Sequence, residues 1–127
     1  MKADWQDPMD RRQDRRWNLP IHIRVFDRSC NALLGHAVDI AAKGLQVISE
    51  DPVPKEHTFH LGLEIILPTG QWEIVPLKAM SVWTRRSSNG LHHTGLHIFE
   101  ISPKALGQIH QLIDSLESFE NQYRPRP

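Results

Sequence analysis

Apolar residues recur at every second position in several short segments of this chain, and stretches containing proline or glycine separate these segments. In the clearest one, 58–67, every odd-numbered residue from Phe59 onward is apolar. A period of two places such side chains on one face of a β-strand. Half-buried strands need a shared core, so the pattern predicts a mainly β fold.

We expect six strands, at residues 21–26, 32–40, 45–48, 58–67, 72–83 and 93–101. Pro76 lies inside the fifth segment, and a proline within a strand belongs at a sheet edge or at a bulge. Gly44 follows a short turn, where we expect a positive φ angle. Pro68 and Gly70 lie between the fourth and fifth segments and indicate a hairpin turn.

The apolar period changes to three and four after Ser102, which indicates an amphipathic helix. Ser102 suits the N-cap of this helix and Pro103 its first position. The recurring apolar residues are Leu106, Ile109, Leu112, Ile113 and Leu116. Six strands followed by one helix predict a six-stranded antiparallel β-barrel that the C-terminal helix caps or plugs.

The chain divides into three parts by composition. Residues 1–18 mix basic and acidic side chains with few aliphatic ones, so we expect a flexible N-terminal arm. The barrel and its helix occupy 19–118, and 119–127 lack any period and are expected to form a disordered tail. At 127 residues, the chain is long enough for one domain with its own core.

Charge, cysteine content and hydropathy narrow the range of possible functions and cellular locations. The 15 basic and 15 acidic residues cancel, which gives no general electrostatic reason to bind DNA or RNA. Cys30 is the only cysteine and forms no internal disulfide, which favours the cytoplasm. No apolar stretch approaches the length of a membrane span, so we expect no membrane insertion. No nucleophile, metal-ligand or acid/base motif is present, so we expect neither an enzyme nor a cofactor or metal.

Four arginines lie within residues 10–16, the densest charge cluster of the chain. Guanidinium groups donate hydrogen bonds in pairs to phosphate or to the O6 and N7 atoms of guanine. The same cluster is also compatible with a solvated arm of mixed charge. Asp39, which closes the second segment, either accepts from the N1 and N2 donors of guanine or forms an Asx-turn.

Two motifs resemble those of PilZ domains, which are receptors for the bacterial second messenger cyclic di-GMP (c-di-GMP). Residues 12–16, Arg-Gln-Asp-Arg-Arg, are similar to the family's RxxxR motif. Residues 39–44, Asp-Ile-Ala-Ala-Lys-Gly, are similar to its D/NxSxxG motif. The order of strands and helix, Val82-Trp83 and the segment 95–99 also resemble the family. The likeness covers roughly residues 10 to 117.

This resemblance implies a ligand clamp in the N-terminal arm. Arg12 and Arg16 match the two motif arginines, which hold the phosphates and guanines of c-di-GMP in the family. Arg11 matches a frequent extra basic residue before them. Because ordering of the arm over the ligand would change the surface of the protein, the resemblance implies a receptor that signals to a downstream protein partner, which the sequence does not identify.

The resemblance also implies a fixed platform on the barrel. Asp39 is expected to bond a guanine edge, Gly44 to permit close approach of the backbone, and Trp83 to stack on a base. Ala41 stands where the motif has serine, and loss of one neutral hydrogen bond costs about 0.5–1.5 kcal/mol. This departure favours the alternative function, a PilZ-like protein-interaction module that binds no nucleotide.

Overall fold

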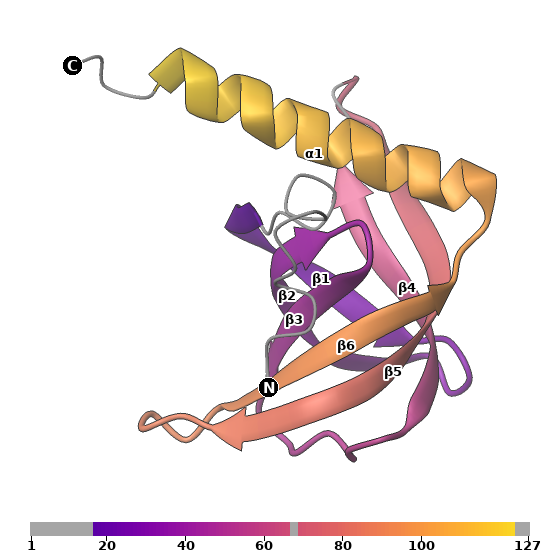
Figure 1. The fold of residues 1–127 in the computed structure, drawn as a ribbon, viewed down its shortest axis with the longest axis vertical. Helices are drawn as coiled ribbons and strands as arrows, with labels where there is room; N and C mark the ends of the chain where they lie inside the picture. Colours follow the sequence, from indigo (N-terminus) through magenta and orange to yellow (C-terminus); the bar gives the residue numbers. More distant parts are fainter. Residues whose placement is uncertain (1–16, 67–68, 124–127) are drawn as a thin grey trace, which may run out of the picture.

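Six strands and one helix make up the fold (Figure 1). The computed structural model describes the backbone of residues 17–66 and 69–123 and the side chains of 23–66 and 69–116. The elements are β1 (Trp17–Asp27), β2 (Ala32–Ala41), β3 (Gly44–Ser49), β4 (Thr58–Ile66), β5 (Trp72–Arg86), β6 (His92–Glu100) and α1 (Pro103–Tyr123). The strands pair in the order β1-β2-β3-β6-β5-β4 and close into a barrel. All six pairings are antiparallel, which confirms the predicted fold.

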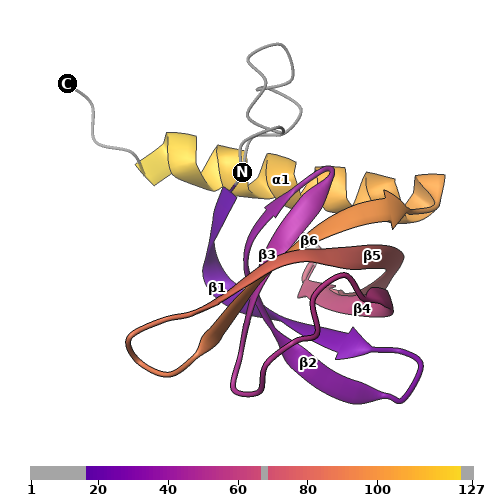
Figure 2. The same ribbon diagram turned by 60° about the horizontal axis from the view of Figure 1, so that its bottom comes forward.

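The core fills the inside of the barrel with the alternating apolar residues of every strand. Fully buried side chains include Val25, Ile40, Leu45, Leu63, Val75 and Leu96. Helix α1 lies across one end of the barrel in both ribbon views (Figures 1 and 2). Its residues Ala105 and Ile109 are buried against the core, so the helix plugs this end of the barrel.

The start of α1 follows the prediction. The Ser102 hydroxyl accepts a hydrogen bond from the backbone N–H of Ala105 at 3.1 Å, which is the N-cap arrangement. The Ser102 carbonyl accepts from the N–H of Leu106 at 2.9 Å. The helix continues to Tyr123, beyond residue 118 where the sequence pattern places the end of the domain.

Strand β5 is the longest element of the sheet and has two differently paired parts. It pairs with β4 from Trp72 to Met80, but with β6 only from Lys78 onward. Pro76 therefore lies where β5 has a neighbouring strand on one side only, which confirms the expected edge position. The pair Ile66–Trp72 closes the predicted hairpin, in which Gly70 has a φ of 89°.

The conformation of Gly44 and the start of the first strand differ from the sequence prediction. Gly44 is not in the left-handed region, where the described glycines are Gly70 and Gly90. It is instead the first residue of β3 and pairs with both Ala41 and His97, so neighbouring strands hold its backbone extended. Strand β1 starts at Trp17, inside the segment 1–18 that was expected to be an arm. No helix in the described part of the chain is long and apolar enough to cross a membrane.

Candidate functional site

Four residues form a continuous row across the outer face of four neighbouring strands. Asp39 on β2 pairs with Gln46 on β3, Gln46 pairs with Gly95 on β6, and Gly95 pairs with Trp83 on β5. The neighbours of these residues along the strands, including Ile40, Leu45, Val47 and Leu96, are buried in the core, so the row faces outward. We call these four residues the polar row. Because adjacent strands lie about 4.8 Å apart, the polar row spans ~14 Å.

Two irregularities in the sheet bring Asp39 and Trp83 to this face. Ala37 and Ser81 are fully buried, and strict alternation would direct the side chains two residues later into the core as well. The register shifts between Ala37 and Asp39 on β2, and between Ser81 and Trp83 on β5. An extra residue in a strand turns the following side chains to the opposite face, so both residues join the outer row.

Asp39 lies within β2 and is only 6% exposed. Its Oδ2 accepts a hydrogen bond from Gln46 Nε2 at 2.9 Å, and Gln46 Oε1 lies 3.2 Å from His93 Nδ1. A carboxylate only accepts, so the amide of Gln46 must direct its NH₂ group to Asp39 and its oxygen to His93. His93 then carries a proton on Nδ1, and this contact holds Gln46 in the orientation that supports the Asp39 carboxylate. The sequence placed Asp39 at the end of a strand, whereas β2 continues to Ala41.

Trp83 is half-buried and lies over the backbone of β6. A Cβ atom on Gly95 would clash with the indole ring of Trp83, so only glycine permits this contact. The guanidinium of Arg85 lies 5.9 Å from the ring centroid of Trp83, within the range of a cation–π contact. Arg85 also pairs with His93 in the β5–β6 register. Burial, together with the positive charge of Arg85, lowers the pKa of His93 below its usual value of 6.5.

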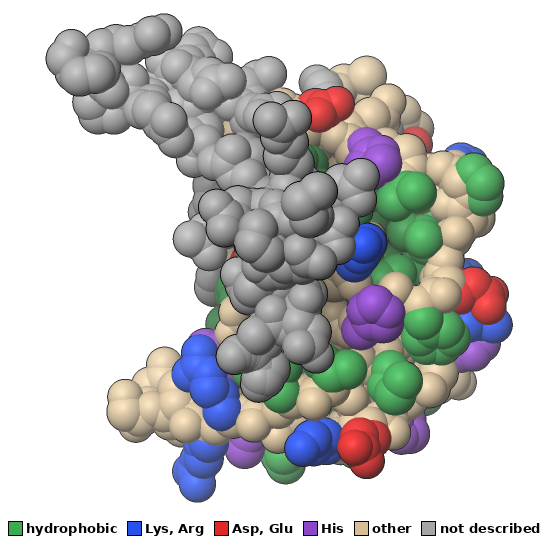
Figure 3. All heavy atoms as spheres, in the orientation of Figure 1, with side chains coloured by type: hydrophobic (Ala, Val, Ile, Leu, Met, Phe, Trp, Pro, Cys, Tyr) green, Lys and Arg blue, Asp and Glu red, His purple; other side chains and the backbone are tan. Residues whose placement is uncertain are grey.

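Positive charge gathers at one end of this surface. Strand β5 ends with Arg85 and Arg86, which are both exposed. In Figure 3, basic side chains lie together where β5 ends and β6 begins, at the lower left of the view. A planar aromatic ring beside guanidinium groups and a buried carboxylate suits a ligand that combines flat bases with phosphates.

The predicted platform residues lie on one face. Gly44 is on the outer face of β3, two residues before Gln46, and pairs with Ala41 of β2. Ala41 is 1% exposed and lies on the same face as Asp39, two residues away along β2. Trp83 lies at the other end of the polar row. The predicted clamp residues, Arg11, Arg12 and Arg16, fall outside the described part of the chain.

Four residues of the surface were missed by sequence reasoning: Gln46, Arg85, His93 and Gly95. Gln46 had a signal, because it is a polar residue between the apolar Leu45 and Val47 and so belongs on the outer face of a strand. Its partners depend on the strand register, which the sequence does not reveal. Among the residues that the structure describes, no group of three or more His, Cys, Asp or Glu side chains is placed to hold a metal ion.

The family model of the PilZ domain matches residues 10–115. The chain therefore belongs to the PilZ domain family, which confirms the predicted resemblance to this family. None of the curated proteins is similar enough in sequence to count as a relative.

Several solved structures share this fold, among them a PilZ domain. The Bacillus subtilis inhibitor of motility, MotI/DgrA, superposes with a TM-score of 0.69 at 14% identity, over 91% of this chain and 54% of that one. Escherichia coli YcgR in complex with c-di-GMP gives 0.67 at 17% identity, over 88% of this chain and 48% of that one. The chain thus spans about half the length of these two proteins. The separate PilZ domain of YcgR, also with c-di-GMP, gives 0.66 at 17% identity over 88% of this chain and 95% of that one.

Proposed function

We propose that this protein is a bacterial c-di-GMP receptor that binds the nucleotide on the polar row of its barrel. The observation that carries the proposal is the row itself, in which the register sets Asp39, Gln46, Gly95 and Trp83 side by side on one outer face. The PilZ domain of YcgR, which has the same fold, was solved with c-di-GMP. Membership of the same family adds further support.

Each part of the ligand has a chemical counterpart in this proposal. The carboxylate of Asp39 accepts from the N1 and N2 donors of a guanine, with its position held by Gln46. The indole of Trp83 stacks on a base, which contributes about 1–3 kcal/mol. Arg11, Arg12 and Arg16 precede β1, the strand that neighbours Asp39 in the sheet, and clamp the phosphates and guanine edges. Gly44 lets the ligand approach the backbone of β3 closely.

The proposed output is a changed surface for a downstream protein partner. The segment before β1, residues 1–16, folds over the bound nucleotide, so the concentration of c-di-GMP controls the surface that a partner meets. In this role the protein is a cytoplasmic signalling adaptor rather than an enzyme. It requires neither cofactor nor metal and has no DNA or RNA partner.

A second candidate is a PilZ protein that binds partner proteins but no nucleotide. Two observations favour it. Ala41 lacks the hydroxyl of the family motif. The Asp39 carboxylate already accepts a hydrogen bond from Gln46, so a guanine must share this group.

Isothermal titration calorimetry of the full chain with c-di-GMP distinguishes the two candidates. We expect saturable heat at micromolar protein and recovery of the nucleotide unchanged. Cyclic di-AMP is the matched control, because adenine has an acceptor at N1, which the Asp39 carboxylate disfavours. Absence of heat with c-di-GMP, from protein whose fold is verified by circular dichroism, would remove the receptor function and leave the interaction module.

A further inference from the structure

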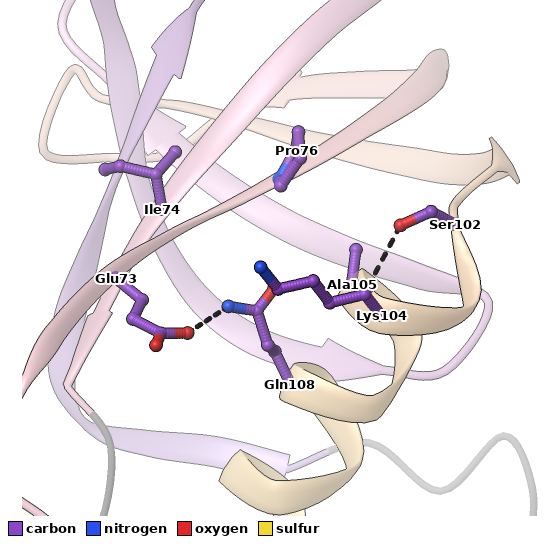
Figure 4. A pocket seen from close by; sticks show the side chains of 7 residues that line it. All are labelled: Glu73, Ile74, Pro76, Ser102, Lys104, Ala105 and Gln108. Atoms are coloured by element: carbon purple, nitrogen blue, oxygen red, sulfur yellow. Dashed lines mark hydrogen bonds between the residues drawn. The ribbon is translucent and has the colours of Figure 1, made fainter.

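A groove lies where β6 leaves the sheet before its neighbour β5 does. Strand β6 ends at Glu100, but β5 continues without it from Leu77 back to Trp72. In the place that β6 would have occupied, a cavity of about 330 Å³ separates Ile74 and Pro76 of β5 from the first turns of α1 (Figure 4). A second cavity of about 200 Å³ shares Pro76 and Ser102 with the first. We call the two together the β5 groove.

The backbone of β5 faces this groove with unused hydrogen-bonding groups. Ser81 donates its N–H to His57 and accepts from the N–H of Glu56, so its backbone points toward β4. The β4–β5 register runs without interruption from Met80 to Trp72, so odd-numbered residues of β5 face β4 and even-numbered ones face away. The N–H and C=O of Ile74 therefore point toward the groove, and no described backbone group bonds them there.

Pro76 gives an independent check of this geometry. By the same alternation its nitrogen points toward the groove, where the missing N–H costs no hydrogen bond with β4. A proline at Val75 or Leu77 would have removed a bond of the β4–β5 ladder. The position of Pro76 therefore agrees with an open edge on this side of β5.

A buried acceptor on α1 also lines the groove. Gln108 is 8% exposed, and its Nε2 donates to the carboxylate of Glu73, as the dashed line in Figure 4 shows. Because that carboxylate only accepts, the amide oxygen of Gln108 must point elsewhere. This Oε1 atom is buried and has no hydrogen-bond donor among the described residues. Buried acceptors are rarely left without a donor, so Gln108 Oε1 is a candidate acceptor for a donor that enters the groove.

We propose that the β5 groove binds an extended peptide segment of a partner protein, which adds to β5 as a short strand. The backbone of the peptide pairs with the N–H and C=O of Ile74, and one of its N–H groups donates to Gln108 Oε1. An open strand edge selects an extended chain, because only such a chain offers donors and acceptors at matching spacing. Trp72 and Ile74 are 61% and 48% exposed and give the added strand apolar side-chain contacts.

The charges of the groove select acidic side chains at the ends of the peptide. Lys78 is paired with Glu100 at 3.2 Å, and one oxygen of Glu73 accepts from Gln108. Lys104 lines the first cavity and Arg28 the second, and neither has an ion-pair partner among the described residues. An extended segment with an acidic residue at each end would pair with both. This site is separate from the polar row, so the proposal holds whether or not c-di-GMP binds.

Hydrogen exchange tests the open edge in the free protein. The Ile74 amide is expected to exchange orders of magnitude faster than the Val75 amide, which bonds to β4. Equal protection of the two amides would mean that the edge is already covered, and would overturn the proposal. Protection of Ile74 that rises with protein concentration would show that a second copy is the occupant, and would also overturn it.

Peptide binding tests the partner. The probe is a library of short acetylated peptides with β-branched residues in the middle and aspartate at both ends, titrated to millimolar concentration against the ¹⁵N-labelled chain. We expect members that shift the signals of Ile74 and the Gln108 side chain and slow exchange at Ile74. Absence of such members, or shifts confined to the neighbourhood of Trp83, would contradict the proposal.

Two variants make the test specific. Ile74→Pro removes the N–H that faces the groove and leaves the β4 ladder intact, so binding should fall at least tenfold, whereas Ile74→Val should retain it. Lys104→Glu tests the same site without any backbone change. It should weaken the binding of peptides that end in aspartate severalfold and strengthen the binding of peptides that end in lysine. Peptide binding that persists unchanged in Lys104→Glu and in folded Ile74→Pro would place the site elsewhere.

Discussion

The polar row and the β5 groove include opposite ends of strand β5. They differ in whether their polar groups already have hydrogen-bond partners. In the polar row, Gln46 is hydrogen-bonded to Asp39 and, on its other side, to His93 beside the row. In the groove, the Gln108 oxygen and the outward backbone of Ile74 have no described partner. A surface whose polar groups are already positioned suits a small rigid ligand, whereas a surface with unmade backbone bonds suits another chain.

The origin of this difference is the pairing of β5. Its last part pairs with β6, and the register shift between Ser81 and Trp83 turns the side chains of Trp83 and Arg85 to the outer face. Its first part extends past the end of β6 and keeps one side open. In our two proposals, one long strand thus contributes to a ligand surface at one end and to a protein-binding edge at the other.

Removal of Arg16 is expected to have the largest effect on the polar row. Charge-assisted hydrogen bonds contribute about 1.5–3 kcal/mol, so Arg16→Ala should raise the Kd for c-di-GMP roughly 10- to 150-fold. The melting temperature of the free protein and peptide binding in the groove should not change. Lys55→Ala, an exposed charge in the β3–β4 loop, is the control and should bind normally. A loss of thermal stability in Arg16→Ala as large as the loss of affinity would mean that the arginine is structural.

Removal of the indole of Trp83 is the next largest expected change. Stacking on one base contributes about 1–3 kcal/mol, so Trp83→Ala should weaken c-di-GMP binding roughly 5- to 150-fold in calorimetry. Val82→Ala changes the exposed neighbour and is the matched control. Equal affinities of the two variants would show that Trp83 belongs to the barrel wall alone.

A matched pair of glutamine substitutions compares the two surfaces directly. Gln46→Met removes a donor from the buried Asp39 carboxylate, so the free energy of unfolding should fall by about 1–3 kcal/mol. Gln108→Met removes an acceptor that has no described donor, together with a donor to the Glu73 carboxylate. Glu73 is only partly buried, so water can replace that donor and the change should stay within about 1 kcal/mol. Urea denaturation measures both values. A larger loss of unfolding free energy in Gln108→Met would show that the Gln108 side chain already has its hydrogen-bond partners in the free protein.

Restoring the motif serine should strengthen the polar row slightly. Ala41 lies beside Gly44 on the outer face, and one added hydrogen bond contributes about 0.5–1.5 kcal/mol. Ala41→Ser should therefore improve the affinity for c-di-GMP by up to about tenfold, while Ala42→Ser in the adjacent turn should not. Weaker binding by Ala41→Ser would indicate that this buried position has no room for a hydroxyl group.

The smallest expected effect is a pH dependence at His93. Burial and the charge of Arg85 lower its pKa in the folded state, so NMR titration should give a midpoint below 6.5 that rises in Arg85→Ala. Because the unfolded chain binds the proton more readily, folding stability should fall as the pH drops through this value. A midpoint that does not move in Arg85→Ala would leave burial as the sole cause.

Much of the fold followed from local patterns, and the errors share one cause. The alternation from Phe59 to Ile65 and the N-cap at Ser102 depend on residues close in sequence, and both are confirmed. The predicted positive φ angle of Gly44 was wrong. Its backbone is set by pairing with Ala41 and His97, and His97 lies far along the chain. Trp83 was expected at a strand end, whereas β5 continues to Arg86.

The sequence by itself determined the strands, the start of the helix, the PilZ motifs and the pairing of arginines with Asp39 as a candidate nucleotide site. It did so because periodicity and motif spacing are properties of neighbouring residues. Only the tertiary structure decided that the polar row consists of Asp39, Gln46, Gly95 and Trp83. It also decided that β5 extends beyond the end of β6, which leaves one edge of β5 unpaired. Register shifts and unequal strand lengths arise when distant segments pair, and no local pattern records them.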